Sequence, residues 1–170
     1  MAAALRLFSQ RGYDGTSPQD IADELGLTKA AVYYHYNTKA EVLHAVRAPL
    51  EKTMTDVIAS AAHLRTRREK IDVLANGFAD AMISQREVMR VVNDPVMNEQ
   101  MKVRRKVPRL DELFEPAVRV LYGDNPTPDQ VLAVHAVAGL GDAIAALPSL
   151  SDDEVREVLV RAVRRLIPQR

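Results

Sequence analysis

A short stretch that begins at Lys29 and reads KAAVYYHY carries side chains suited to contacts with a nucleic acid. At about 100° per residue, a helix in this stretch would bury Val32 against the rest of its domain. Ala30, Tyr33 and Tyr34 would then point away from the core. Lys29 would lie beside them in the first turn. One cation, one methyl group and two phenols form a face that the major groove of DNA can accept.

The distribution of tyrosines bears on whether these phenols are functional. A single tyrosine in a small helical domain is more often a half-buried core residue than a binding residue. Four of the five tyrosines, however, lie in the first quarter of a chain that has no tryptophan, namely Tyr13, Tyr33, Tyr34 and Tyr36. A small domain cannot bury all four, so some of them are expected to face solvent or a ligand.

The element that must position this face is a preceding short helix. Ser17 is a favoured N-cap residue, Pro18 suits the first helical position, and Asp20 can complete a capping box. Gly26 can take the left-handed conformation that ends a helix, which limits this one to about two turns. The apolar side of the helix is formed by Ile21, Ala22 and Leu25.

Two further signals complete a helix-turn-helix pattern. Leu27 is predicted to return to the core, and Thr28 can cap the helix that follows. Thr38 with Glu41 at the N3 position then predicts another capping box and another helix. This helix start places Lys39 beside the end of the preceding helix, where a lysine can reach a DNA phosphate.

The amino-terminal residues resemble those of the tetracycline-repressor (TetR) family of bacterial transcriptional regulators. The resemblance covers about residues 3–46. The residues that carry it are Ala4-Leu5, Leu7-Phe8, Gly12-Tyr13, Gly15-Thr16-Ser17, Asp20-Ile21-Ala22, Leu25-Gly26-Leu27, Val32-Tyr33-Tyr34-His35-Tyr36, Thr38-Lys39 and Glu41-Val42-Leu43.

The resemblance implies DNA binding, repression and specific contact residues. It places phosphate-side or groove-side contacts at Ser17, Thr28, Tyr33, His35 and Lys39. It places base-reading positions at Gln19, Lys29, Ala30 and Tyr34. Two features depart from the family pattern: Tyr36 replaces the usual phenylalanine, and the basic arm that often precedes the first helix is absent from this sequence.

The amino-acid composition is compatible with DNA binding but does not by itself indicate it. The chain has 170 residues, of which 47% are hydrophobic and 27% charged, enough for one or two compact units with a sizeable core. Its 23 basic and 23 acidic residues balance, so no overall field attracts a polyanion. Local placement of charge can outweigh the net value, because Asp20, Asp23 and Glu24 lie on the helix that need not enter the groove.

Several classes of protein and site are disfavoured by the sequence. The absence of cysteine excludes disulfides, thiolate catalysis and cysteine zinc sites. No apolar run approaches the roughly 20 residues of a membrane helix, and the first residues do not form a signal peptide. We therefore expect a soluble, cytoplasmic protein with no metal site and no cofactor.

Beyond the first 46 residues the pattern is helical throughout. We expect a DNA-binding domain at residues 1–46 and a helical ligand-binding and dimerisation domain at residues 47–170, with Pro49 interrupting or restarting a helix at the boundary. The predicted helices of the second domain span about 49–63, 67–85, 86–106 with a break near Pro95, 109–122 with a kink near Pro116, 127–147 and 151–167.

The last two predicted helices favour a homodimer through residues 127–167. The first of them is apolar nearly all round, with Gly139 and Gly141 allowing close approach, and the second has one continuous apolar side. One small domain has few partners to cover both, so pairing of two chains in a four-helix bundle is expected. The alternative is that they are the central helices of a monomer.

A methionine-rich set predicts a cavity for a small apolar or amphipathic effector. Its members are Phe78, Met82, Met89, Met101, Phe114, Tyr122 and His135. Taken singly, each is more simply a core residue. His135 and Asp142 lie seven residues apart, which raises an enzymatic alternative, but no serine or second histidine at a motif spacing completes a catalytic site, and the histidines form no metal-ligand pattern.

The sequence thus predicts an all-α fold with a three-helix amino-terminal head. Its leading interpretation is a ligand-responsive, homodimeric regulator, most simply a repressor, that a small molecule releases from a palindromic DNA operator. One alternative is a small-molecule-binding or enzymatic helical protein that retains the head as a scaffold. Another is an adaptor that acts only through its helical bundle.

Overall fold

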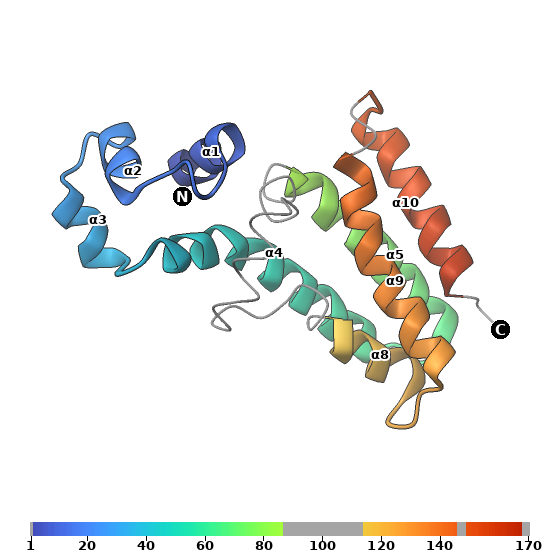
Figure 1. The fold of residues 1–170 in the computed structure, drawn as a ribbon. Coiled ribbons are helices and arrows are strands. Elements are labelled where there is room, and N and C mark those ends of the chain that lie inside the picture. The colour runs from blue at the N-terminus through green and yellow to red at the C-terminus, as the bar shows by residue number, and fades with distance from the viewer. Residues whose placement is uncertain (1, 87–113, 146–148, 168–170) are drawn as a thin grey trace. The chain divides into compact units, whose positions relative to one another are not determined.

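The computed structural model describes residues 2–86, 114–145 and 149–167, and within these ranges the chain forms α-helices and no strands (Figure 1). The predicted all-α fold is confirmed. The predicted helix at 86–106, with its break near Pro95, falls outside the described residues. The helices are α1 (Ala2–Arg11), α2 (Pro18–Glu24), α3 (Lys29–His35), α4 (Lys39–Ala62), α5 (Arg67–Ser84), α8 (Glu115–Tyr122), α9 (Pro128–Ala145) and α10 (Asp152–Leu166).

The described residues divide into two compact units. The first contains residues 2–50, and the second contains residues 51–86, 114–145 and 149–167. Helix α4 contributes to both, so the chain passes from one unit to the next within a helix. The predicted domain division between residues 46 and 47 stays a prediction.

The prediction that Pro49 interrupts or restarts a helix is wrong, because Pro49 lies inside the 24-residue helix α4. Proline removes one backbone donor, but its fixed φ of about −65° is close to the helical value. The loss of one hydrogen bond is small against a helix of this length that buries residues on both sides of the proline, including Val46 and Leu50.

The capping signals at Ser17, Gly26 and Thr28 form the predicted structures. The Oγ of Ser17 accepts from the backbone N–H of Asp20, whose carboxylate accepts from the N–H of Ser17. Gly26 ends α2 with a φ of 64°, and the Oγ1 of Thr28 caps α3 by accepting from the N–H of Ala31. These contacts are local in sequence, so they mark where both short helices begin and where α2 ends.

The core of the first unit lies between α1, α2, α3 and the start of α4. Its buried apolar side chains include Ala4, Leu7, Phe8, Ile21, Val32, Val42 and Leu43. The predicted return of Leu27 to the core is wrong, since its side chain is 49% exposed, and Leu25 on the apolar side of α2 is 47% exposed. Leu25 is the C-cap residue of α2 and Leu27 lies in the turn, and both side chains stay about half exposed.

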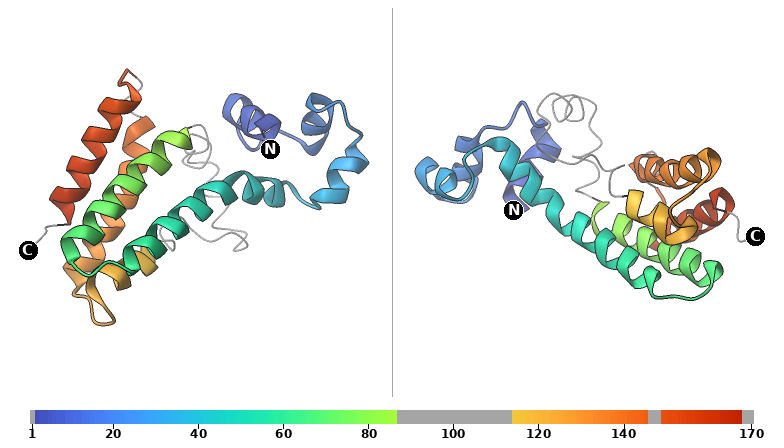
Figure 2. Two further views of the ribbon diagram at one scale, coloured as in Figure 1. Left: turned by 180° about the vertical axis from the view of Figure 1, so that it is seen from behind. Right: turned by 90° about the horizontal axis from the view of Figure 1, so that it is seen from below.

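In the second unit, α10 packs along α5 and beside α9 (Figure 2). Arg156 of α10 donates two hydrogen bonds to the carboxylate of Asp80 on α5, both at 2.9 Å. Arg164 contacts Asp72 at 2.8 Å in the same seam. The apolar side of α10 faces the core through Val155, Leu159 and Val163. Ion pairs at the rim thus align a helix pair that buried aliphatic side chains hold together.

Two close contacts define the interior of the second unit. A Cβ atom added to Gly77 of α5 would lie 2.4 Å from Cγ1 of Val57 on α4, so the glycine is required for this approach. The rings of Phe78 and Phe114 pack edge to face with centroids 6.1 Å apart. Pro116 lies in the first turn of α8, where no intrahelical donor is needed. Residues 109–113 of the helix predicted at 109–122 fall outside the described residues, so its kink near Pro116 stays a prediction.

Candidate nucleic-acid interface

Helix α3 presents the face that its sequence predicts. Val32 is buried at 6% exposure, whereas Tyr33 and Tyr34 are 38% and 85% exposed. Lys29 and Ala30 are exposed as well. A tyrosine side chain that is 85% exposed takes no part in a core, and its phenol is accessible to a partner.

The side chains of this face contact one another. The Nζ of Lys29 lies 5.7 Å from the ring centroid of Tyr33, within the range of a cation–π contact. The rings of Tyr34 and His35 pack edge to face at 5.2 Å. These contacts restrict the side chains before any partner binds, and they leave the cation and the phenols at the surface.

Helix α2 places the other predicted contact residues, Ser17 and Gln19, at its exposed start. Ser17 is engaged in the capping box, and its side-chain hydrogen bond to Asp20, with a second from its backbone, holds the pKa of that carboxyl below its ordinary value. The Nε2 of Gln19 donates to Asp23 at 2.6 Å. The second N–H and the Oε1 of Gln19 do not take part in this hydrogen bond.

Two of the three acidic residues of α2 are paired with arginines of α1. Arg6 forms an ion pair with Glu24, and Arg11 forms one with Asp20 at 3.2 Å. Sequence reasoning did not find these partners, because they are 18 and 9 residues apart and depend on how α1 crosses α2. The pairs offset negative charge that would otherwise repel a phosphate backbone.

The ammonium group of Lys39 contacts other residues of the head. Its Nζ donates to the carbonyl oxygens of Tyr13 at 2.5 Å and Thr16 at 2.9 Å. The same atom lies 4.1 Å from the centroid of the Tyr13 ring. The structure therefore brings Ser17, Thr28 and the face of α3 to the exposed surface of the helix-turn-helix, and it gives Lys39 contacts with the loop between α1 and α2.

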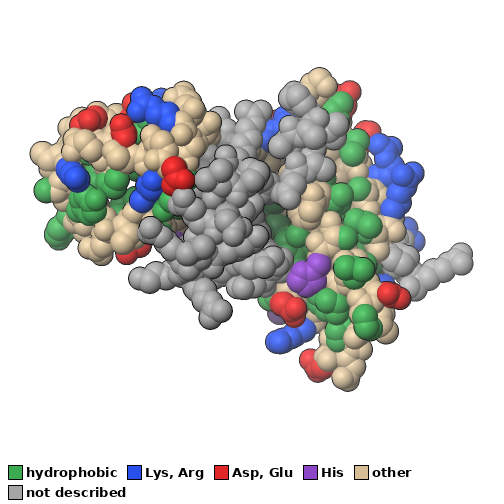
Figure 3. Space-filling view, viewed as in Figure 1, with side chains coloured by type: hydrophobic (Ala, Val, Ile, Leu, Met, Phe, Trp, Pro, Cys, Tyr) green, Lys and Arg blue, Asp and Glu red, His purple; other side chains and the backbone are tan. Residues whose placement is uncertain are grey.

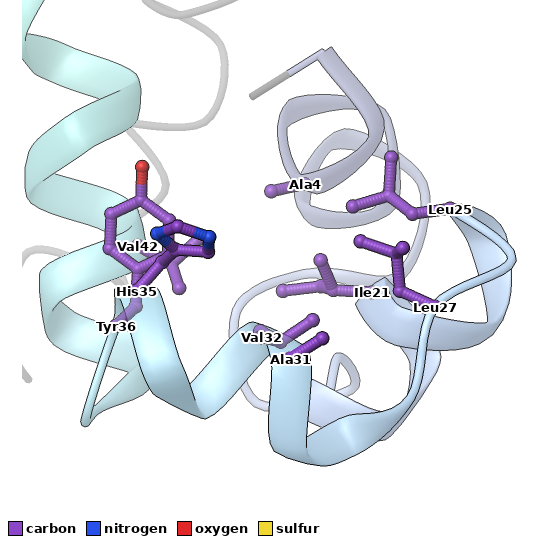
Figure 4. A pocket seen from close by; sticks show the side chains of 9 residues that line it. All are labelled: Ala4, Ile21, Leu25, Leu27, Ala31, Val32, His35, Tyr36 and Val42. Atoms are coloured by element: carbon purple, nitrogen blue, oxygen red, sulfur yellow. The ribbon is translucent and has the colours of Figure 1, made fainter.

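A small apolar hollow lies on the inner side of α3 (Figure 4). Its volume is about 110 Å³. The side chains of Leu25 and Leu27 point toward Ala4 and Ile21, so the two half-exposed leucines border this hollow and are not surrounded by solvent alone. The remaining lining residues are Ala31, Val32, His35, Tyr36 and Val42.

The predicted effector residues take several different environments in the second unit. Phe78, Met82 and Phe114 are buried. The hydroxyl of Tyr122 accepts from Arg67 at 3.1 Å, and the Nε2 of His135 lies 3.7 Å from Glu115. Met89 and Met101 fall outside the described residues.

No residue of the predicted effector set lines either of two hollows on the described chain, the one beneath α3 and a larger one of about 550 Å³ beside α10. The larger hollow is lined mainly by arginines, namely Arg156, Arg161, Arg164 and Arg165, with Asn76, Glu157 and Val160. Two of these arginines are the partners of Asp80 and Asp72. The effector cavity stays a prediction.

Two kinds of site find no support in the part of the chain that the structure describes. It contains no group of three histidine, aspartate or glutamate side chains arranged to hold a metal ion. None of its helices combines the length and apolar character that crossing a membrane requires.

The amino-terminal head is similar in sequence to known proteins. Residues 1–46 fit the family described as bacterial regulatory proteins, tetR family. A 39-residue segment is 49% identical to the HTH-type negative transcriptional regulator IcaR of the biofilm operon icaADBC from Staphylococcus epidermidis. That segment is 23% of this chain and 21% of the relative, so this likeness concerns about a fifth of each protein.

Solved structures match nearly the whole chain. The TetR-family regulator PfmR from Thermus thermophilus aligns with 97% of this chain and 94% of its own at 22% identity, with a TM-score of 0.69. A regulator of the TetR/AcrR family from Thermobifida fusca aligns with 99% of this chain and 95% of its own at 26% identity, with a TM-score of 0.56. Residues 1–46 therefore belong to the tetR family of bacterial regulatory proteins, and the chain as a whole shares the fold of solved TetR-family regulators.

Proposed function

We propose that this chain is a homodimeric repressor that binds a palindromic DNA operator through α3 and is released by a small molecule. The observation that carries the proposal is the division of α3 into a buried side at Val32 and an exposed side with Tyr33 and Tyr34. A helix of this kind, held by a second helix behind it, is the form in which a helix-turn-helix enters the major groove. IcaR, which resembles the head, is a negative transcriptional regulator, and this favours repression.

The proposed contacts divide into two roles. Hydroxyl and imidazole groups at the edges of the face would bind phosphates and position the helix, namely Ser17, Thr28, Tyr33 and His35. Side chains at its centre and on α2 would read bases, namely Gln19, Lys29, Ala30 and Tyr34. Phosphate contacts carry affinity for any sequence, whereas base contacts carry the preference between sequences.

An exposed apolar strip on α9 supports pairing of two chains. Leu132 is 68% exposed, and Ala136 and Gly139 are exposed one and two turns further along. A Cβ atom added to Gly139 would meet no atom within 4 Å among the described residues, and Gly139 itself is exposed. Figure 3 shows hydrophobic side chains gathered over α9. A second copy of this chain, contributing its own α9 and α10, would cover the strip and complete a four-helix bundle.

The effector is proposed to be apolar or amphipathic and to bind in the second unit near Phe78, Met82 and Phe114. The edge-to-face packing of Phe78 on Phe114 gives this region an aromatic wall. His135 of α9 and Tyr122 of α8 would supply polar groups at its edge, since a pocket of this kind needs few of them. A ligand can release DNA only by binding more tightly to the conformation that DNA disfavours.

The experiment that tests DNA binding selects sites from a random duplex pool and measures affinity for the enriched duplex over a range of salt concentrations. The proposal expects an inverted repeat with half-site centres separated by about 34–36 Å or a multiple of it. It expects affinity to fall steeply with salt, because bound phosphates release counterions. Enrichment of no sequence, with no salt-dependent binding, would refute it.

A further inference from the structure

The loop between α1 and α2, residues 12–17, has a conformation that few sequences can adopt. Gly12 ends α1 with a φ of 71°, and a Cβ atom added to Gly15 would lie 2.2 Å from the carbonyl oxygen of Arg11. Thr16 is buried, and its Oγ1 donates to the carbonyl oxygen of Gly12 at 2.9 Å. The loop leads directly to Ser17, the N-cap of α2. Its position therefore sets where α2 begins.

Lys39, the first residue of α4, joins this loop to a helix more than twenty residues away. Its ammonium group donates to the carbonyls of Tyr13 and Thr16 at 2.5 and 2.9 Å. It also lies 4.1 Å above the ring of Tyr13, which is itself buried and packs against Phe8 at 5.5 Å between centroids. One side chain thus makes two hydrogen bonds and one cation–π contact to a single loop.

The positive charge of Lys39 lies in an unfavourable place, the first turn of α4. A cation in the first turn of a helix faces the positive end of the helix dipole, so the position by itself disfavours a charged lysine. Two carbonyl oxygens and an aromatic face compensate, and the side chain is only half-exposed. Carrying the ammonium group to a phosphate would remove that compensation from the loop as well as from the lysine.

We propose that Lys39 is a positioning residue of the DNA-binding head, which holds the loop of residues 12–17 and thereby sets the start of α2 and the seating of α3. The role rests on the proposed DNA-binding function. It differs from the phosphate contact that the family resemblance implies for this lysine. In this role Lys39 acts through α2 and α3, and it keeps its contacts with Tyr13 and Thr16 when DNA is bound.

The test compares the full chain carrying Lys39→Met with the full chain carrying Lys52→Met. Lys52 is an exposed lysine of the same helix, and among the contacts described it pairs only with Asp56, four residues away. Affinity for the selected duplex is measured across salt concentrations. We expect Lys39→Met to weaken binding roughly tenfold, as for the loss of hydrogen bonds to a charged group, with an unchanged slope of log affinity against log salt. Lys52→Met should change neither quantity.

A phosphate contact predicts a different result. Each lost contact reduces the slope by about 0.9, so a dimer would lose about 1.8. A slope change of that size, with unaltered backbone amide resonances for residues 12–17 in the free variant, would overturn the proposal. The expected result is an unchanged slope with shifted resonances and faster amide exchange in that loop.

A measurement on the wild-type protein decides the question even if Lys39→Met does not fold. The ε-methylene protons of Lys39 lie over the Tyr13 ring, so the ring current should move their resonance upfield. We expect this shift both without and with the duplex. Its absence in the free protein, or its loss on binding DNA, would refute the proposal. If the wild-type protein binds no duplex, the proposed function fails, whereas the loop and ring-current measurements on the free protein still report on Lys39.

Discussion

The contact between Gly77 and Val57 makes a sharp prediction about the packing of α4 against α5. In Gly77→Ala the new methyl carbon would lie 2.4 and 2.6 Å from the two Cγ atoms of Val57. Real contacts of this kind do not occur, so one helix must move. Val57 cannot rotate away easily, because a β-branched side chain in a helix has one strongly preferred rotamer.

The magnitude follows from two opposing terms. Overpacking a closely packed site costs about 1–3 kcal/mol. Alanine is intrinsically better than glycine inside a helix by about 1 kcal/mol. The net loss of unfolding free energy in Gly77→Ala should thus reach about 2 kcal/mol, which corresponds to a fall in Tm of up to about 8 °C for a chain of this size.

A double-mutant cycle separates the two terms. Val57→Ala removes both Cγ atoms, so Gly77→Ala in that background should be neutral or stabilising by up to about 1 kcal/mol. The coupling energy between the two sites should be about 1–3 kcal/mol by urea or thermal unfolding. Additive effects of the two substitutions would refute the close approach of α4 and α5 at this point.

Three further predictions concern the capping boxes, the dimer and the DNA contacts. Hydrogen bonds from the hydroxyl and backbone N–H of Thr66 lower the pKa of the Glu69 carboxyl from its ordinary 4.5. The stability that Glu69 contributes is therefore present above about pH 4.5 and is lost as pH falls through the lowered pKa. Glu69→Gln should flatten this part of the curve of unfolding free energy against pH, and an unchanged curve would contradict the capping role of Glu69. Leu132→Glu and Gly139→Arg should each give monomers in sedimentation experiments, whereas a variant that stayed dimeric with full DNA affinity would remove α9 from the interface. Tyr33→Ala should weaken binding to all duplexes by a similar factor in a titration series, and a selective loss for one sequence would reassign Tyr33 to base reading.

Local signals in the sequence predicted the head well. The caps at Ser17 and Thr28 and the left-handed Gly26 each depend on groups within a few residues, so they can be recognised without knowing the fold. The exposed side of α3 followed from Val32 alone, since one buried position fixes the orientation of a two-turn helix. Helical periodicity also located α5, α9 and α10 to within a few residues of their observed ends.

Interactions between distant segments could not be predicted in the same way. The carbonyl acceptors of Lys39 lie 26 and 23 residues away, and no pattern of residue types identifies a backbone carbonyl. The pairing of Arg156 with Asp80 depends on the register between α10 and α5, and the two residues are separated by 76 positions in the sequence. Pro49 was misjudged for the converse reason, because packing on both sides of the proline outweighs a local preference to end the helix.

We propose that the exposed face of α3 reads DNA sequence. Site selection from a random duplex pool by the wild-type protein and by Lys29→Ala tests it most directly, with Lys52→Ala as a control on the same chain. Lys29 lies on the exposed face, whereas Lys52 belongs to the second unit.

The wild-type protein should enrich an inverted repeat. Lys29→Ala should lose its preference at one position in each half-site and keep it elsewhere, since a wrong base pair costs about 1–3 kcal/mol and separated positions act nearly independently. Lys52→Ala should select the same sequence as the wild type. The contradicting result is that Lys29→Ala, and also variants at Ala30 and Tyr34, select the wild-type sequence at every position. In that case α3 would not be the helix that reads the bases.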